Sequence, residues 1–201
     1  MSSETLYKYR SLDNWKFLID ILINQRLFAA HFETLNDPME GRFFYDEGIP
    51  QDYRDLIIYR KQEWRICSLT RNPRNTLMWS YYGGEHKGLA LEFTVPRRKH
   101  QIIRPVNYDY GLHLQPQHTQ SALDDVAVQI LSQKMSNWHH EDEVRVFTQH
   151  DFIDIRLSKI ILGCRVAGDD RRLIRSLVRK ADLSIPVHTM KHQHLDAAIP
   201  F

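Results

Sequence analysis

Residues 67–93, CSLTRNPRNTLMWSYYGGEHKGLALEF, join two apolar segments through a connection rich in aromatic, hydroxyl, imidazole and glycine groups. The apolar composition of Trp64–Leu69 and Leu89–Phe93 predicts two strands, the second largely buried. Thr76–Tyr82 predicts one or two helical turns that end at Gly83-Gly84. A connection that only joins elements seldom needs this mixture, whereas loops on a rigid scaffold often carry function. The stretch is therefore the first candidate site.

Helical and strand periodicities alternate on both sides of this stretch. Ser11 is expected to cap the first helix, and Ser121 with Asp124 is expected to begin another that runs to about Asn137. These patterns predict an α+β (mixed α/β) fold with an irregular, partly antiparallel sheet in a single domain, residues 1–201. The apolar stripe of the first helix is expected at Leu12, Trp15, Leu18, Ile19, Leu22 and Ile23. The remaining helices are expected at 52–63 and 169–180, and the remaining strands at 6–10, 27–32, 101–110, 143–148, 153–162 and 185–189.

Composition is typical of an ordinary globular protein. The 201 residues include 26% charged and 42% apolar residues, which argues against wholesale disorder. The 27 Lys and Arg against 25 Asp and Glu leave a formal charge of +2, which disfavours binding of nucleic acid by bulk charge but allows local basic patches. Cys67 and Cys164 lie in apolar segments and predict buried free thiols. No apolar run approaches a membrane span, and the start resembles no signal peptide, so a cytoplasmic protein without a membrane partner is expected.

The second candidate site is the segment 138–147, WHHEDEVRVF. In a strand, Glu141, Glu143 and Arg145 would share one side, while Val144 and Val146 would face the core. Two neighbouring carboxylates repel, so one pKa is expected to rise unless Arg145 compensates. Such a pair suits general-base work or the stabilisation of a developing cation. The alternative is a solvated strand face with a salt bridge of at most about 1 kcal/mol.

The third candidate is Arg10, which closes the segment Tyr7-Lys8-Tyr9-Arg10. The guanidinium of an Arg at the end of a short strand can grip a phosphate through two parallel hydrogen bonds. Arg side chains also commonly bind helix-end carbonyls or carboxylates, and this structural interpretation is equally open.

Within the first candidate, Trp79, Tyr81 and Tyr82 could stack on a planar ligand, with Ser80 and His86 supplying hydrogen bonds. The alternative is that these rings belong to the core and that the glycine pair only forms a turn. Aromatic residues dominate cores as well as binding sites, so the sequence leaves both interpretations open.

Metal chemistry has little support in the sequence. His188, His192 and His194 cluster near the end of the chain, but no carboxylate or Cys partner follows at ligand spacing, and no metal site is expected. The basic segments 97–100 and 171–180 could contact nucleic acid, although solvated charge is the simpler interpretation. GxSxG, P-loop and GxGxxG motifs do not occur.

The chain carries a series of ordered motifs: Leu6 to Leu12, Phe32, Leu35 to Glu40, Cys67 to Leu69, Leu77 to Tyr82, His86 to Gly88, Trp138, Glu141, Glu143, Arg145 and Lys159 to Gly163. In this order they resemble the bacterial domain of unknown function 2971 family, and the resemblance spans nearly the whole chain. Tyr81 departs from the family pattern, which usually carries His there.

The resemblance implies a toxin, phage-defence or abortive-infection role, and the layout is similar to that of ADP-ribosyltransferases, which consume NAD. By that analogy Glu143 would stabilise the oxocarbenium-like state, and Glu141 would activate the acceptor. Arg10 would bind pyrophosphate, and Tyr82 would stack on nicotinamide, with Trp79, Ser80, Tyr81, His86 and Arg145 completing the cofactor site. The expected partners are a nucleotide ligand and a nucleic-acid or protein acceptor. Two alternatives remain: a non-catalytic ligand-binding or regulatory module, and a metal-dependent nuclease using Glu141 and Glu143.

Overall fold

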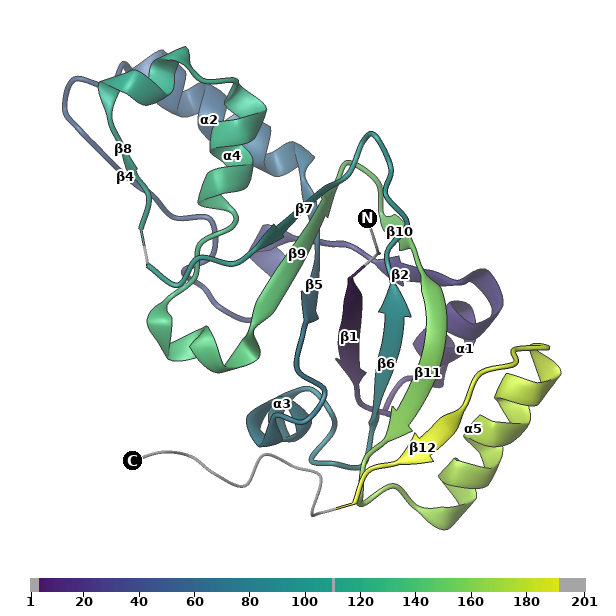
Figure 1. Cartoon of the computed structure of the whole chain (residues 1–201). Coiled ribbons are helices and arrows are strands. Elements are labelled where there is room, and N and C mark those ends of the chain that lie inside the picture. The colour runs from purple at the N-terminus through teal and green to yellow at the C-terminus, as the bar shows by residue number, and fades with distance from the viewer. Residues whose placement is uncertain (1–3, 110, 192–201) are drawn as a thin grey trace. The chain divides into compact units, whose positions relative to one another are not determined.

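The computed structural model describes residues 4–109 and 111–191, which form two compact units (Figure 1). The first, unit 1, draws on the segments Met1–Leu27, Leu69–Arg97 and Asp154–Phe201. The second, unit 2, draws on Phe28–Ser68 and Arg98–Ile153. The chain therefore passes between the units several times, and each unit is assembled from segments distant in sequence.

Unit 1 is built on a mixed sheet with the strand order β12-β11-β6-β1. Strands β1 (Thr5–Arg10), β6 (Leu89–Thr94) and β11 (Arg156–Leu162) are successively antiparallel. Helix α5 (Gly168–Lys180) connects β11 to β12 (Val187–Thr189), which lies parallel to β11. Strand β11, helix α5 and strand β12 therefore form a strand–helix–strand crossover.

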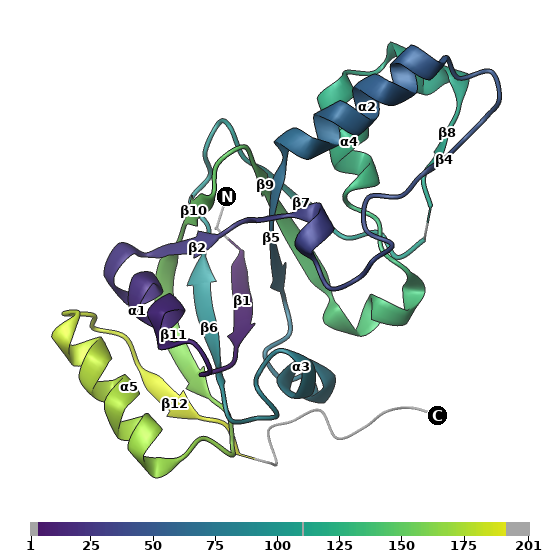
Figure 2. The same cartoon turned by 180° about the vertical axis from the view of Figure 1, so that it is seen from behind.

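Helices flank this sheet. Helix α1 (Trp15–Asn24) follows β1, and α1 and α5 lie side by side in both views (Figures 1 and 2). The short helix α3 (Thr76–Tyr81) precedes β6 and buries Met78 and Trp79 in a cluster with Tyr9, Ala90 and Met190. This cluster fixes the first candidate segment to the sheet of unit 1.

Unit 2 combines short strand pairs with two helices. Strand β7 (Ile102–Pro105) pairs antiparallel with β9 (Glu143–Thr148). Helices α2 (Gln51–Glu63) and α4 (Leu123–Ile130) pack together. The other elements are β3 (Ala30–His31), which pairs with β5 (Arg65–Thr70), β4 (Phe44–Tyr45), which pairs with β8 (His113–Leu114), and the 3-10 turns η1 (Phe32–Thr34), η2 (Pro116–Gln120) and η3 (Ser136–Glu141).

The boundaries of two helices differ from the sequence predictions. The cap of α1 is Asn14, whose side chain accepts a hydrogen bond from the Lys16 amide, rather than Ser11. Ile21, which was not predicted to be buried, faces the core, whereas Ile23, which was, is 67% exposed. The helix predicted over 121–137 is also too long: α4 ends at Ile130, and Ser121 closes η2 instead of capping α4.

Two predicted strands are broken, and a segment for which no helix or strand was predicted contains short regular elements. The segment 27–32 divides between β2 (Arg26–Phe28), β3 and η1, and 153–162 divides at Ile155 between β10 (Phe152–Asp154) and β11. The segment 111–120 contains β8 and η2 and buries Leu114. Cys67 is buried as predicted, whereas Cys164 is partly exposed.

The mixed α/β class and the partly antiparallel sheet are confirmed, and the register shift between Leu157 and Lys159 gives the sheet its irregularity. That residues 1–201 form one domain of the proposed family's type stays a prediction. Within the described residues, no helix has the length and apolar character needed to cross a membrane.

Candidate functional site

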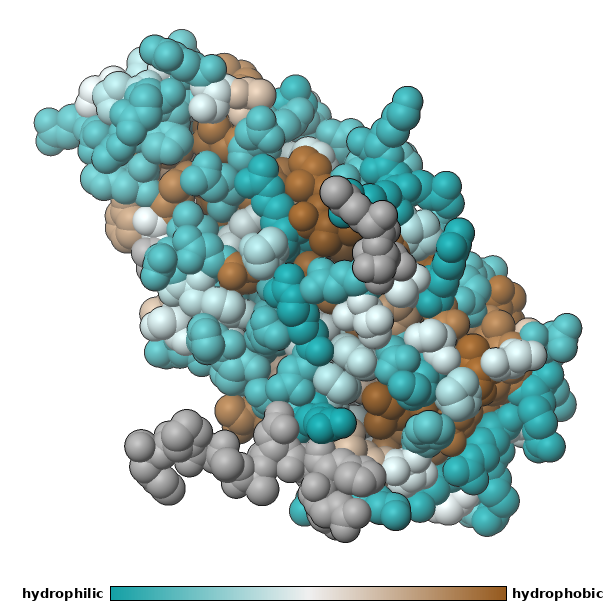
Figure 3. Space-filling view, in the orientation of Figure 1, coloured by the Kyte–Doolittle hydropathy of each residue, from teal (hydrophilic) through white to brown (hydrophobic). Residues whose placement is uncertain are grey.

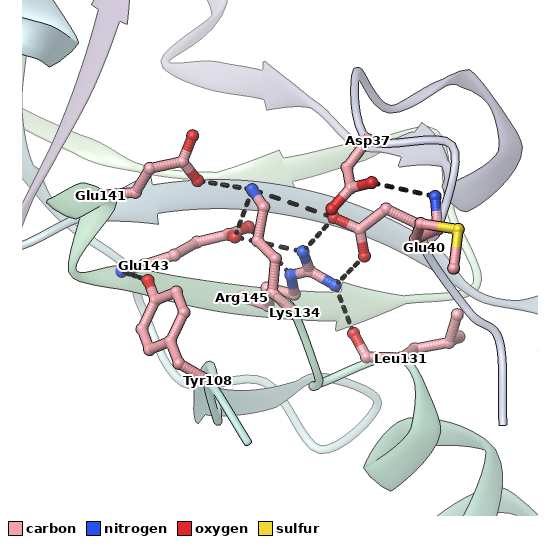
Figure 4. A network of polar contacts seen from close by, with 9 residues as sticks. Asp37, Glu40, Tyr108, Leu131, Lys134, Glu141, Glu143 and Arg145 are labelled. Atoms are coloured by element: carbon pink, nitrogen blue, oxygen red, sulfur yellow. Dashed lines mark hydrogen bonds and ion pairs between the residues drawn. The ribbon is translucent and has the colours of Figure 1, made fainter. Parts of the chain in front are cut away.

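Five charged side chains meet in the interior of unit 2: Glu40, Lys134, Glu141, Glu143 and Arg145 (Figure 4). Each is at most 8% exposed. We call this group the ionic cluster. It contains three carboxylates and two cations, so its balance with every group ionised is one negative charge. Buried charges of this kind are tolerated only when they are paired and hydrogen-bonded.

Local structure explains how two acids close in sequence both reach the cluster. Glu141 ends η3 and Glu143 begins β9, so the two do not share the face of one strand as predicted. Asp142 between them has a left-handed backbone with φ of 43°. Glu40 comes from the turn after Asp37, whose Oδ1 accepts a hydrogen bond from the Met39 amide at 2.9 Å.

Arg145 makes five hydrogen bonds and is fully buried. Its Nη1 and Nη2 donate to Glu40 at 2.8 and 2.6 Å, and its Nε and Nη2 donate to Glu143 at 2.8 and 3.1 Å. Nη1 also donates to the Leu131 carbonyl at 2.5 Å. A guanidinium has five N–H donors, so this set leaves none for a cofactor. In this conformation Arg145 orients Glu143 and Glu40, and its predicted contact with a cofactor, which would require one of these hydrogen bonds to open, stays a prediction.

Lys134 bridges the carboxylates of the cluster. Its Nζ lies 2.5 Å from Glu141, 3.2 Å from Glu143 and 3.9 Å from Glu40. It also lies 4.9 Å from the centre of the Trp138 ring, a distance suited to a cation–π contact. The ammonium takes the position that a divalent cation bridging Glu141 and Glu143 would need, which weighs against the nuclease alternative.

The cluster changes the acidity of its carboxylates. Burial alone would raise the pKa of Glu143, but Arg145 and Lys134 outweigh it and lower that pKa to about 2. For Glu40 burial prevails over the neighbouring Arg145, and its pKa is raised. Glu143 therefore stays ionised at neutral pH, and the expectation of a solvated salt bridge is wrong because both partners are buried.

Tyr108 adds a contact to the backbone at the start of β9. The Glu143 amide donates to the Tyr108 Oη at 2.8 Å, and burial raises the pKa of this phenol. Its ring meets His139 edge to face with 5.2 Å between the ring centres. The neutral Tyr108 phenol thus helps to fix the backbone of Glu143.

In unit 1, Trp79 belongs to the core. It is 0% exposed, meets Tyr9 edge to face at 5.0 Å, and donates from Nε1 to the Pro73 carbonyl at 2.9 Å. This enclosure agrees with the core interpretation of Trp79, and the stacking of its ring on a ligand stays a prediction. Trp79 also supports His86, whose ring lies nearly parallel to it, with an angle of 13° and 6.1 Å between centres.

The remaining groups of this segment differ in exposure. Ser80 Oγ donates to the Thr76 carbonyl at 3.0 Å and lies 3.5 Å from Nε2 of the buried His86. Tyr81 is 63% exposed and meets the partly buried Tyr82 edge to face. The two tyrosine rings are therefore accessible to a planar ligand, whereas the His86 ring is buried beside Ser80.

Arg10 lines a pocket of about 140 Å³ within unit 1. Its guanidinium carbon lies 5.5 Å from the centre of the Phe17 ring. The pocket is lined by both polar and apolar residues: Arg10, Ser11, Asn14, Phe17, Leu18, Ile21 and Leu89. The placement of Arg10 in a pocket agrees with a binding role, which stays a prediction.

Close backbone packing joins Arg10 and His86 to their neighbours. A Cβ at Gly88 would lie 2.1 Å from the Arg10 carbonyl oxygen, and a Cβ at Gly163 would lie 2.1 Å from that of His86. Only glycine permits these approaches. His86 itself has a φ of 68°, a conformation that non-glycine residues seldom adopt.

Unit 2 brings Glu141, Glu143 and Arg145 together, whereas the 79–86 segment and Arg10 lie in unit 1. Sequence reasoning missed Lys134, which it placed inside a long helix, and Glu40, which it named only at the end of the motif Leu35 to Glu40. The signal available for Lys134 was an isolated cation between the apolar helix and the two acids. Among the described residues, no three His, Cys, Asp or Glu side chains form a set that could hold a metal, and His192 and His194 lie outside them.

No protein-family model and no curated protein sequence matches the chain. Membership of the domain of unknown function 2971 family therefore stays a prediction. Among solved structures, Thermus sp. 2.9 DarT in complex with carba-NAD+ matches with a TM-score of 0.42 and 12% sequence identity. That match covers 97% of this chain and 99% of the other. The candidate sites thus rest on the geometry of this chain's own residues.

Proposed function

We propose that this chain is an NAD-consuming enzyme of the ADP-ribosyltransferase type, with Glu143 as its catalytic carboxylate. The observation that supports this most is the ionised state of Glu143 in an enclosed site, held by Arg145 and Lys134. Cleavage of the bond between nicotinamide and ribose passes through an oxocarbenium-like state that a fixed carboxylate stabilises. A dry site strengthens that stabilisation, because charges there are poorly screened.

In the proposed reaction the bond between ribose C1 and the nicotinamide nitrogen breaks, and nicotinamide leaves neutral with the bonding electron pair. The acceptor attacks C1, and Glu141 takes the acceptor's proton. For this to occur a ribose hydroxyl must replace Lys134 as the partner of Glu143, and Lys134 must also release Glu141. Arg145 keeps its own hydrogen bonds and acts as a positioning residue.

In unit 1, Arg10 would bind the pyrophosphate. Tyr82 would stack on nicotinamide, with Tyr81 beside it and with Ser80 held by His86. The acceptor would be nucleic acid or protein. A cytoplasmic toxin or phage-defence role in bacteria is the biological context that the resemblance implies, and it belongs to the same proposal.

The test is the release of nicotinamide from NAD, measured by chromatography with and without nucleic acid and protein acceptors. We expect release by the native chain and at least a hundredfold loss in Glu143→Gln, which should keep its circular dichroism spectrum. Glu47→Gln is the matched control, because Glu47 is an exposed acid of the same unit. Absence of release with every acceptor would contradict the proposal.

A second function, a non-catalytic nucleotide-binding module, is favoured by one specific observation. Both oxygens of Glu143 are engaged inside the protein, Oε1 by Arg145 and Oε2 by Arg145 and Lys134. A binding module would show thermal stabilisation by NAD without nicotinamide release. Measuring both quantities on one sample separates the two functions.

A further inference from the structure

Helix α5 carries three basic side chains without partners on its exposed side. Arg175, Arg179 and Lys180 are all exposed, and within the described residues their side chains make no hydrogen bond or ion pair. We call these three residues the α5 basic face. Arg172, one turn earlier, is exposed too but pairs with Asp169.

The packing of α5 holds this face outward. Ile174 and Val178 are buried and fix the opposite side of the helix in unit 1. Arg175 and Arg179 are four positions apart, so they lie about 6 Å apart along the helix axis on the same side. The charges are thus presented by a rigid element rather than by a loose loop.

Acidic residues occur only at the ends of the helix. Asp169 and Asp170 lie in its first turn, and Asp182 follows its end. Between residues 171 and 181 the sequence contains no acid. The formal charge of the whole chain is only +2, so this positive region is local. Figure 3 has the orientation of Figure 1, in which α5 lies at the lower right. The outer edge of the molecule there is mostly hydrophilic.

The charged groups of the α5 basic face indicate which partner it would bind. Arg guanidinium groups bind phosphate through paired hydrogen bonds, and a row of cations along one helix matches the spacing of successive phosphates in a nucleic-acid backbone. Attachment to a lipid surface would need a broad apolar side as well. Leu173 is the one large exposed hydrophobic residue among those described for α5, which is too little for insertion.

We propose that the α5 basic face binds the phosphate backbone of a nucleic acid, independently of base sequence. This surface shares no residue with the NAD site proposed above, so it could bind nucleic acid whether or not the chain consumes NAD. Three neutralised phosphates would release about three counterions, so binding should weaken steeply with salt.

The test is fluorescence anisotropy of a labelled 20-base-pair duplex of random sequence and of its single strand, with the full chain. Between 50 and 200 mM salt, three phosphate contacts predict a loss of duplex affinity of about 40-fold. In Arg175→Gln/Arg179→Gln one contact remains, and the loss should fall to about 4-fold. A single strand should give a shallower dependence than the duplex.

Arg42→Gln/Arg156→Gln is the matched control, because it removes the same charge from exposed arginines outside both basic segments. Gln is nearly as good a helix former as Arg, so the α5 variant should keep its circular dichroism spectrum. The control should retain the native salt dependence. The proposal would be overturned if the two variants lost duplex affinity equally between 50 and 200 mM salt. It would also be overturned if the native chain did not bind the duplex at 50 mM salt.

Discussion

Arg145 and Glu40, 105 positions apart in the chain, form a two-bond ion pair in the interior of unit 2. The pair ties the start of β9 to the turn at residues 37–41, and Arg145 also holds Glu143. A buried ion pair adds little net stability compared with an apolar pair, but loss of one partner leaves the other charge uncompensated. Breaking this pair should therefore lower the free energy of unfolding, which can be measured directly.

Replacing Arg145 should destabilise the protein strongly. Arg145→Met leaves Glu40 and Glu143 without their main cation, and we expect the free energy of unfolding to fall by about 3–5 kcal/mol. Urea denaturation followed by circular dichroism measures the change. Arg42→Met, at an exposed position, should cost within about 0.5 kcal/mol. A loss below about 1 kcal/mol in Arg145→Met would show that the cluster is not buried as described.

Acid should weaken the fold through Glu143. Its pKa is about 2 in the folded state and 4.5 as the ordinary value, so the unfolded chain binds the proton first as pH falls. The stabilising contribution is complete above pH 4.5 and is lost between pH 4.5 and 2, by up to about 3 kcal/mol. The difference in unfolding free energy between the native chain and Glu143→Gln should narrow over this range. A constant difference would mean that Glu143 is not held ionised.

Lys61 should also make the folded state more stable as pH rises, but in the alkaline range. Its ammonium is buried near the Phe32 and Phe43 rings and donates to the Gly41 carbonyl at 2.5 Å. Burial lowers its pKa from 10.5 to about 8, against a weaker opposing effect of Glu33. Between pH 8 and 10.5 the unfolded chain binds more protons, so rising pH should favour the folded state.

The expected gain from Lys61 is up to about 3 kcal/mol. It is measured as the unfolding free energy of the native chain minus that of Lys61→Met, which cancels the titration of other groups. A difference that stays flat or falls between pH 8 and 10.5 would show that the Lys61 ammonium is well solvated in the folded state.

Gly163 should tolerate no side chain. A Cβ there would lie 2.1 Å from the His86 carbonyl oxygen, and the backbone would have to move. We expect Gly163→Ala to lower the free energy of unfolding by about 3 kcal/mol. Gly48→Ala is the matched control, since nothing lies within 4 Å of its Cβ position. Equal stability of the two variants in a thermal melt would show that the 83–88 loop can shift at little cost.

Hydrophobic periodicity predicted much of the fold. The apolar segments that became β1, β5, β6 and β9, and the helices α2 and α5, lie within one or two residues of their predicted positions. The start of α1 was missed because two residues that cap helices well, Ser11 and Asn14, both precede it. The division of 153–162 was missed because Ile155, which is buried, continues the apolar pattern across the break.

The candidate site was less predictable, because its decisive contacts join residues distant in sequence. Spacing alone predicted that Glu143 and Arg145 lie on one face of a strand. It could not predict that both faces of β9 are buried. That depends on packing within unit 2. The partner residues Glu40 and Lys134 carry no local pattern that distinguishes them from surface charges. Their roles follow only from distances in the folded chain.

The proposed function requires Arg10, the 79–86 segment and Glu143 to contact the same ligand. The most direct test is to map backbone amide shifts in the NMR spectrum of the isotope-labelled chain during titration with a non-hydrolysable NAD analogue. The account predicts that the amides of Arg10, Tyr82 and Glu143 shift together, with one common dissociation constant. Shifts confined to one unit, or no shifts at millimolar analogue, would contradict it.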